Sequence, residues 1–229
     1  LTTDENGYAK SGELEAGSYT VKELTASKGY IVDVTAHNVT VEPEKTAAVT
    51  VREVPQSNPM DLLLQKLDKE RKKAEPQGSA SLAEAQFTVK VYTGQSDTDP
   101  AAGGAKPART WIFKTDAEGK VHFSKNYLVS GDAFYTQTDG KTPCLPLGTV
   151  TVQETKAPAG YFANDTVFVQ KITAGGAKET ISCYNASSVE EQVYRGGVKV
   201  QKRDLETKKA EAQGGATLEG VVFTVTSLN

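Results

Sequence analysis

The feature that most constrains this chain is an internal repeat. The segment QKLDKERKKAEPQGSASLAEAQFTV (65–89) aligns without a gap with QKRDLETKKAEAQGGATLEGVVFTV (201–225). The segment YTVKELTASKGY (19–30) aligns in the same way with VTVQETKAPAGY (150–161). Segments that recur in this way indicate a tandem array of one structural unit, so the unit has to be identified before any single residue is interpreted.

The order of the repeated segments predicts the domain organisation. A third and shorter pair is TDENG (3–7) and TDAEG (115–119), and only residues 60–190 contain all three kinds of segment. We therefore expect one complete repeat at 60–190, with the C-terminal part of a repeat at 1–55 before it. The N-terminal part of a following repeat is expected at 197–229.

Short strands are the expected secondary structure. Apolar and polar residues alternate in runs of about five residues, and such a period of two is typical of a half-buried β-strand. Turn residues such as Asp139-Gly140 and Gly175-Gly176 separate these runs. No segment has a sustained helical period. These patterns predict an all-β chain, an immunoglobulin-like or prealbumin-like β-sandwich.

Composition excludes several functions. Lys and Arg number 26 and Asp and Glu 29, for a net charge of −3; nucleic-acid binding requires a basic face. No run of about 18 apolar residues is present to span a membrane. The two Cys and two His residues are too few and too scattered for a metal site, and no cofactor motif is present. The chain begins without Met or a signal-like segment, so we interpret it as a fragment.

One set of motifs resembles a known family. The pattern consists of Lys66-x-Asp68, then TDAEG, then E-x-x-A-P-x-G-Y from Glu154 to Tyr161, then an apolar strand that ends at Asn185. It resembles the Cna-B-type domains, the prealbumin-like, isopeptide-forming repeats of Gram-positive surface adhesins and pilins. The resemblance covers nearly the whole chain, and the E-x-x-A-P-x-G-Y segment is its most specific part.

The resemblance implies a cross-link. In that family a Lys on the first strand joins an Asn on the last strand, assisted by an acidic residue. Transferred to this chain, the isopeptide bond links Lys66 to Asn185 and Glu154 promotes its formation. Alternation also places Lys66 and Asn185 on apolar strand faces, where burial favours a neutral amine and a protonated carboxyl. A self-cross-link forms once per molecule, so we expect no enzyme activity.

The flanking repeats hold parts of the same site. Glu23 and Lys202 occupy the positions of Glu154 and Lys66 in the partial repeats, but the first of these repeats has no Asn at the expected acceptor position. Two open half-domains expose sheet edges, which is an aggregation hazard. Either the tail of one chain completes the head of another, or the boundaries of the fragment cut through flanking domains.

Three further features leave alternatives open. The long segments 92–110 and 124–146 suggest a ligand-binding adhesin domain as the rival function, because loops on a rigid sandwich often bind partners. Cys144 and Cys183 either pair in an exported protein or remain small buried thiols. Trp111 is expected in the core rather than in a ligand platform.

The predicted function is a structural stalk module of a cell-surface adhesin or pilin, located outside the bacterial cell. Attachment to the cell wall is expected through parts outside this segment. The expected partners are neighbouring repeats of the same protein, a second copy of the chain through the partial repeats, and a host extracellular ligand.

Overall fold

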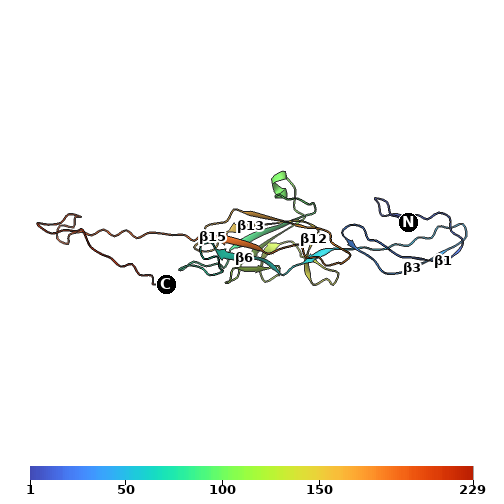
Figure 1. Ribbon diagram of the computed structural model, residues 1–229, viewed down its shortest axis with the longest axis horizontal. Helices are drawn as coiled ribbons and strands as arrows, with labels where there is room; N and C mark the ends of the chain where they lie inside the picture. Colours follow the sequence, from blue (N-terminus) through green and yellow to red (C-terminus); the bar gives the residue numbers. More distant parts are fainter. Residues whose placement is uncertain (229) are drawn as a thin grey trace.

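The computed structural model describes residues 1–228, which form an elongated molecule with three parts in chain order (Figure 1). We name residues 1–55 the head segment, residues 56–195 the central module and residues 197–228 the tail segment. The head and the tail lie at opposite ends of the central module (Figure 1). The main hydrophobic core lies entirely within the central module.

A five-stranded antiparallel sheet forms one face of the central module, with the strand order β10-β8-β7-β13-β14. Its strands are β7 (Gln86–Tyr92), β8 (Arg109–Lys114), β10 (Leu128–Gly131), β13 (Gly148–Lys156) and β14 (Val167–Ile172).

Two three-stranded sheets form the other face, in the orders β15-β6-β9 and β11-β12-β5. Their strands are β5 (Ser57–Pro59), β6 (Leu62–Asp68), β9 (Lys120–His122), β11 (Tyr135–Thr136), β12 (Pro143–Pro146) and β15 (Ser187–Glu191).

Side chains of both faces meet in one core. On β7 every second residue points inward, so Phe87 and Val89 are fully buried, and β8 adds Trp111 in the same way. From the opposite face, Leu64 of β6 and Val189 of β15 join this cluster. The predicted β-sandwich is confirmed, and Trp111 is a core residue as expected.

The first long strand and the last strand of the module lie side by side and run parallel. In the register of β6 and β15, Val189 is opposite Lys66 and Glu191 is opposite Asp68. Strand β6 is therefore flanked by β15 on one edge and by β9 on the other. Parallel strands need a long crossover connection, which here is the whole module between them.

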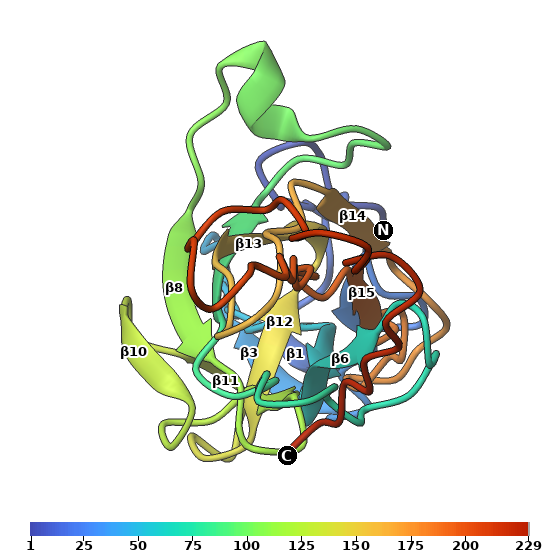
Figure 2. The ribbon, with the colours of Figure 1, turned by 90° about the vertical axis from the view of Figure 1, so that its left-hand side faces the viewer.

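The two long segments differ in character. Residues 124–146 contain β10, β11 and β12, and Phe134 packs on Trp111 with ring centroids 6.1 Å apart, so this segment builds the core. Residues 92–110 carry a short 3-10 helix, η1 (Pro100–Gly103), which projects from the sandwich (Figure 2). Cys144 and Cys183 are both free thiols in the structure.

The head segment is a small set of paired strands. Strand β1 (Gly17–Val21) pairs antiparallel with β3 (His37–Val41), and β2 (Tyr30–Ile31) pairs with β4 (Val54–Pro55). Gly17 is opposite Val41, which is the register that joins Gly148 to Ile172 in β13 and β14. The predicted repetition of sequence is therefore also a repetition of strand register.

The tail segment forms turns but no strand within residues 197–228. Its large apolar side chains are exposed: Val198, Val200, Leu205, Val221, Val222, Phe223, Val225 and Leu228. The counterparts of Phe223 and Val225 in the central module, Phe87 and Val89, are fully buried. The division into repeats at 1–55, 60–190 and 197–229 stays a prediction. Two pairings of the central module, at β5 and at Val193, lie just outside 60–190.

Candidate functional site: a buried lysine between two glutamates

Lys66 is the centre of the candidate site. It lies on β6 with none of its surface exposed, because the alternation of that strand turns it toward the core. Its Nζ donates to Oε1 of Glu154 at 2.5 Å and to Oε1 of Glu191. The same Nζ lies 5.3 Å from the centroid of the Phe87 ring. A lysine is almost never fully buried unless it is paired, and here two carboxyl groups are its partners.

The two glutamates come from opposite faces of the sandwich. Glu191 lies on β15, where Ser187, Val189 and Glu191 point inward in turn. Glu154 lies near the end of β13, and its second oxygen accepts the backbone N–H of Asn164 at 2.8 Å. The site therefore joins β6 and β15 of one face to β13 of the other.

The electrostatics of the cluster favour an uncharged carboxyl. Burial, followed by the contact with Glu154, raises the pKa of Glu191, and the charge of Lys66 only partly offsets this rise. Oε2 of Glu191 is buried and has no hydrogen-bond partner among the described residues. Two carboxylates and one ammonium would leave a net negative charge in the core, which is unfavourable where solvation is lost. The arrangement thus places an amine against a carboxyl that tends to hold its proton.

The structure does not bring Asn185 to this site. Asn185 is exposed, and its backbone N–H and carbonyl both bond the side chain of Gln170, at 2.8 and 2.6 Å. The physical reason is the position of the last strand. It begins at Ser187, beyond Asn185, so the residue that reaches Lys66 is Glu191. Of the three residues predicted for the cross-link, the structure unites Lys66 and Glu154.

A signal for Glu191 was present in the sequence. The motif Val-x-Glu occurs at 51–53 and again at 189–191, in each case shortly before the end of a repeat. The alternation of Ile181, Cys183 and Asn185 instead predicts a last strand that ends at Asn185. Those three residues lie outside any strand of the structure.

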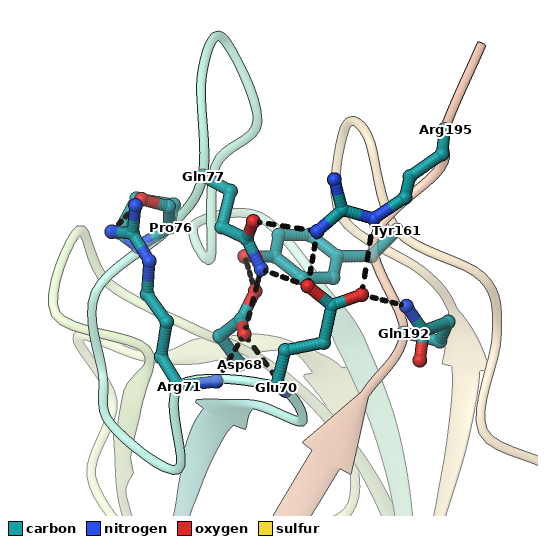
Figure 3. Close-up of polar contacts among 8 residues, drawn as sticks. All are labelled: Asp68, Glu70, Arg71, Pro76, Gln77, Tyr161, Gln192 and Arg195. Carbon is teal, nitrogen blue, oxygen red and sulfur yellow. Dashed lines mark hydrogen bonds and ion pairs between the residues drawn. The ribbon is translucent and has the colours of Figure 1, made fainter.

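A second buried polar cluster lies on the same strand (Figure 3). Asp68 is fully buried and accepts hydrogen bonds from the backbone of Arg71 at 2.8 Å, from Nε2 of Gln77, and from the Tyr161 hydroxyl at 2.9 Å. Burial alone would raise the pKa of Asp68, but these bonds and one from the Glu70 backbone outweigh it and lower the pKa. Burial and Asp68 raise the pKa of Tyr161 to about 12.

This second cluster ties the end of the module to its beginning. Arg195 and Gln192, which follow β15, both bond the carboxylate of Glu70 in the turn after β6 (Figure 3). Three hydrogen bonds, from Arg195, Gln77 and Gln192, lower the pKa of Glu70 to about 2. The Lys-x-Asp motif therefore places two different polar clusters on β6. In one, the amine of Lys66 meets two carboxyl groups. In the other, hydrogen bonds satisfy the buried carboxylate of Asp68.

The predicted partial-site residues lie far apart. Glu23 is in the head segment and Lys202 in the tail segment, at opposite ends of the molecule (Figure 1). Within residues 1–228 no group of three or more His, Cys, Asp or Glu side chains is arranged to hold a metal ion. No helix in the same residues has the length and apolar character needed to cross a membrane.

These observations define the class of protein, an all-β sandwich of prealbumin type. A family model described as "SpaA: Prealbumin-like fold domain" matches residues 1–55 and 68–187. The match covers more than half of the chain, so the chain belongs to the SpaA family of prealbumin-like fold domains. The resemblance to prealbumin-like repeats of Gram-positive surface proteins is thereby confirmed at the level of the family.

Several solved structures match this chain. The Bacillus anthracis TIE protein has a TM-score of 0.52 and 24% identity, over 83% of this chain and 28% of that one. A streptococcal ancillary pilin has a TM-score of 0.31 and 19% identity, over 79% of this chain and 43% of that one. A C-terminal fragment of the pilus adhesin SpaC from Lactobacillus rhamnosus GG has a TM-score of 0.40 and 15% identity, over 82% of this chain and 81% of that one. A search of curated proteins found no match.

Proposed function

We propose that the central module is a load-bearing segment of a bacterial surface adhesin or pilus, cross-linked by an amide between Lys66 and Glu191. The observation that carries the proposal is the fully buried Lys66 held between Glu154 and Glu191, across the parallel first and last strands. Membership in the SpaA prealbumin-like family supports this class of protein and a location at the cell surface.

The strand geometry suits a part that carries tension. The chain enters β6 at Leu62 and leaves β15 at Glu191, and because the strands are parallel these two points are at opposite ends of the pair. The head and tail correspondingly extend in opposite directions (Figure 1). Tension between the chain ends loads all hydrogen bonds between β6 and β15 together, in shear, rather than one after another.

The chemistry is a condensation. The neutral amine of Lys66 attacks Cδ of protonated Glu191, and a C–N bond forms. The hydroxyl group of Glu191 leaves as water, with its proton transferred from the amine through Glu154, which returns to its starting state. A dry site favours this step, because the condensation releases water and bulk water is excluded from the new amide. With Glu191 as acceptor the product is water, whereas an Asn acceptor such as Asn185 would release ammonia.

The bond would stabilise the module strongly. Lys66 and Glu191 are 125 residues apart in the chain. By analogy with disulfides, closing such a loop contributes about 4–5 kcal/mol through the unfolded state. An amide also resists reductants, which cleave disulfides by thiol exchange. The reaction occurs once per molecule, so the proposed role is structural and not enzymatic.

Single-molecule pulling tests this function. When the chain is stretched from residues 1 and 229, we expect no extension from the segment between Lys66 and Glu191 at forces that unfold ordinary sandwiches. A Lys66→Met variant should show an added extension that corresponds to that segment. The proposal is wrong if the wild-type chain releases the segment as readily as the variant.

Ligand binding is the second candidate function. The observation that favours it is the projection of residues 92–110 and η1 away from the sandwich (Figure 2). This segment is anchored at its base, where Gln95 bonds the Ile172 carbonyl and Ser96 bonds Thr149. Deleting residues 95–106 should abolish the binding of a host matrix protein while leaving the pulling behaviour unchanged. Unchanged binding in that deletion variant would exclude the segment as the binding surface.

A further inference from the structure

The segment that follows β13 returns to β15 and lies along its end. We name residues 160–166 the strap. Tyr161, near the start of the strap, forms an antiparallel bridge with Val193, two residues beyond β15. The strap therefore connects the sheet that carries Glu154 with the strand that carries Glu191.

One residue of the strap, the half-buried Asn164, bonds to both sides of the candidate site. Its backbone N–H donates to Oε2 of Glu154 at 2.8 Å. Its side-chain Nδ2 donates to the carbonyl of Glu190 at 3.1 Å, and its Oδ1 accepts the backbone N–H of Thr166 at 2.9 Å. Asn164 is thus bonded to the carboxyl group of Glu154 and to the residue directly before the proposed acceptor, Glu191.

The bond from Asn164 determines how the carboxyl group of Glu154 is oriented. Oε1 of Glu154 accepts from Nζ of Lys66 at 2.5 Å, while Oε2 accepts from Asn164, so the group cannot rotate without breaking one of these bonds. Glu154 also contacts the carboxyl group of Glu191. A side chain that moves a proton between two groups has to stay within hydrogen-bond reach of both.

The head segment contains an independent copy of the same turn. The backbone N–H of Asp33 donates to Oε2 of Glu23 at 2.5 Å, and Oδ1 of Asp33 accepts the N–H of Thr35 at 2.8 Å. Both turns have the sequence Asn/Asp-x-Thr, so the turn follows from local sequence. An aspartate has no amide group to donate, and Oδ2 of Asp33 instead bonds His37 at 2.8 Å. Of the two copies, Asn164 is the one that combines the turn with a donor to a strand.

We propose that Asn164 is a positioning residue for amide formation between Lys66 and Glu191, an inference that rests on the cross-link proposed above. It acts through Glu154. The bond to the Glu190 carbonyl fixes the place of Asn164 on β15, and the turn aims its backbone N–H. That N–H holds Oε2 of Glu154, so that Oε1 remains directed at the amine. No bond is made or broken at Asn164 itself.

A time course of intact mass tests the proposal. The full chain is produced by cell-free synthesis, samples are denatured at intervals, and the fraction lighter by one water molecule is followed. Asn164→Ala loses both side-chain bonds and should react at least about tenfold more slowly than the wild type, because a small misplacement of a reacting group has a cost of that order. Asn126→Ala, which changes an exposed asparagine in another turn of the module, is the matched control and should react at the wild-type rate.

A conservative variant separates positioning from a loss of folding. In Asn164→Asp the new carboxylate can still accept the Thr166 N–H, as Asp33 does in its own turn, but it cannot donate to the Glu190 carbonyl. Its rate should lie between those of the wild type and Asn164→Ala. Thermal unfolding of Asn164→Ala combined with Lys66→Met, in which no amide can form, should still show a cooperative transition, so that the slower reaction is not a failure to fold.

The outcomes distinguish this inference from the cross-link itself. If the wild type loses water and Asn164→Ala does so equally fast, the positioning role is overturned and the cross-link stands. The role is also overturned if Asn164→Asp reacts no faster than Asn164→Ala. If Asn164→Ala does not fold, a wild-type rate in Asn164→Asp has the same consequence. A wild-type chain that never loses water overturns both proposals.

Discussion

The head segment and the central module share one strand pattern but differ in what surrounds it. Both contain a hairpin with the same register and a Glu bonded by a backbone N–H ten residues later. Tyr161 is nevertheless 1% exposed, while its counterpart Tyr30 is 39% exposed. The central module differs by having β6 and β7, which supply the lysine, the aspartate and the apolar cover.

This difference shows which property is local. Hairpin register follows from short-range alternation and turn residues, so it is the same in both copies. Burial of the polar cluster depends on strands that are distant in sequence. A change that removes one contribution of β6 should therefore make the central module resemble the head, and the same change in the head should have little effect.

The largest expected effect is that of Lys66→Met. Loss of the amide should lower the unfolding free energy of the central module by about 4–5 kcal/mol, because the unfolded chain is no longer cross-linked. It also leaves the carboxyl groups of Glu154 and Glu191 without the lysine that pairs them. Urea unfolding measures the change, with Lys120→Met on the exposed side of β9 as the control. Equal stability of the two variants would contradict the account.

The next largest effect is a difference in stability between two glycine substitutions, one in each region. Gly160 has a φ of 85°, and an added Cβ would lie 2.6 Å from Cβ of Ala80, so Gly160→Ala should destabilise the central module by about 2–4 kcal/mol. Gly29 has a φ of 89°, but its added Cβ would meet only the end of the Leu147 side chain, at 2.8 Å. Gly29→Ala should leave the main thermal transition nearly unchanged. A larger shift for Gly29→Ala would reverse the comparison.

Two tyrosine substitutions, one in each region, test the hydrogen-bonded cluster around Asp68. Tyr161→Phe removes a hydrogen bond to the buried Asp68 and should lower the unfolding free energy by about 1.5–2 kcal/mol. Tyr30→Phe should change it by less than about 0.5 kcal/mol, the usual range for a surface site. Denaturant unfolding of both variants measures the two values. If both variants lose the same stability, the Asp68 bond is not what distinguishes the regions.

The smallest effect is a pH dependence. The pKa of Asp68 is lowered in the folded chain from its ordinary value of 3.8. Asp68 therefore stabilises the fold above that pH, and its contribution is lost as the pH falls through its folded pKa. The stability difference between the wild type and Asp68→Asn should be constant near neutral pH and should shrink below about pH 4. A difference that grows on acidification would contradict the lowered pKa.

Much of the fold could be predicted from the sequence, because alternation and turn chemistry are short-range signals. The strands around Phe87 and Val150 follow directly from them. The sequence predicts a loop at 124–146, and the burial of this segment has no local signal because Phe134 packs on the rings of Trp111 and Phe113 in another strand.

The site could be predicted in part. Lys66 and Glu154 belong to repeated motifs, so both were identified from the sequence and both lie in the cluster. The acceptor position depends on where β15 begins, and that depends on its parallel pairing with β6 across the whole module. Such long-range pairing leaves only a weak signal in a single sequence, and so Asn185 was selected where the structure places Glu191.

The most direct test of the central claim is the intact mass of the denatured, reduced chain. The account predicts that the wild type and an Asn185→Ala variant each have the mass of their sequence less one water molecule. Lys66→Ala and Glu191→Ala chains should each have their full mass. A wild-type chain at full mass would contradict the cross-link, and a loss of one ammonia that disappears in Asn185→Ala would show that Asn185, not Glu191, is the acceptor.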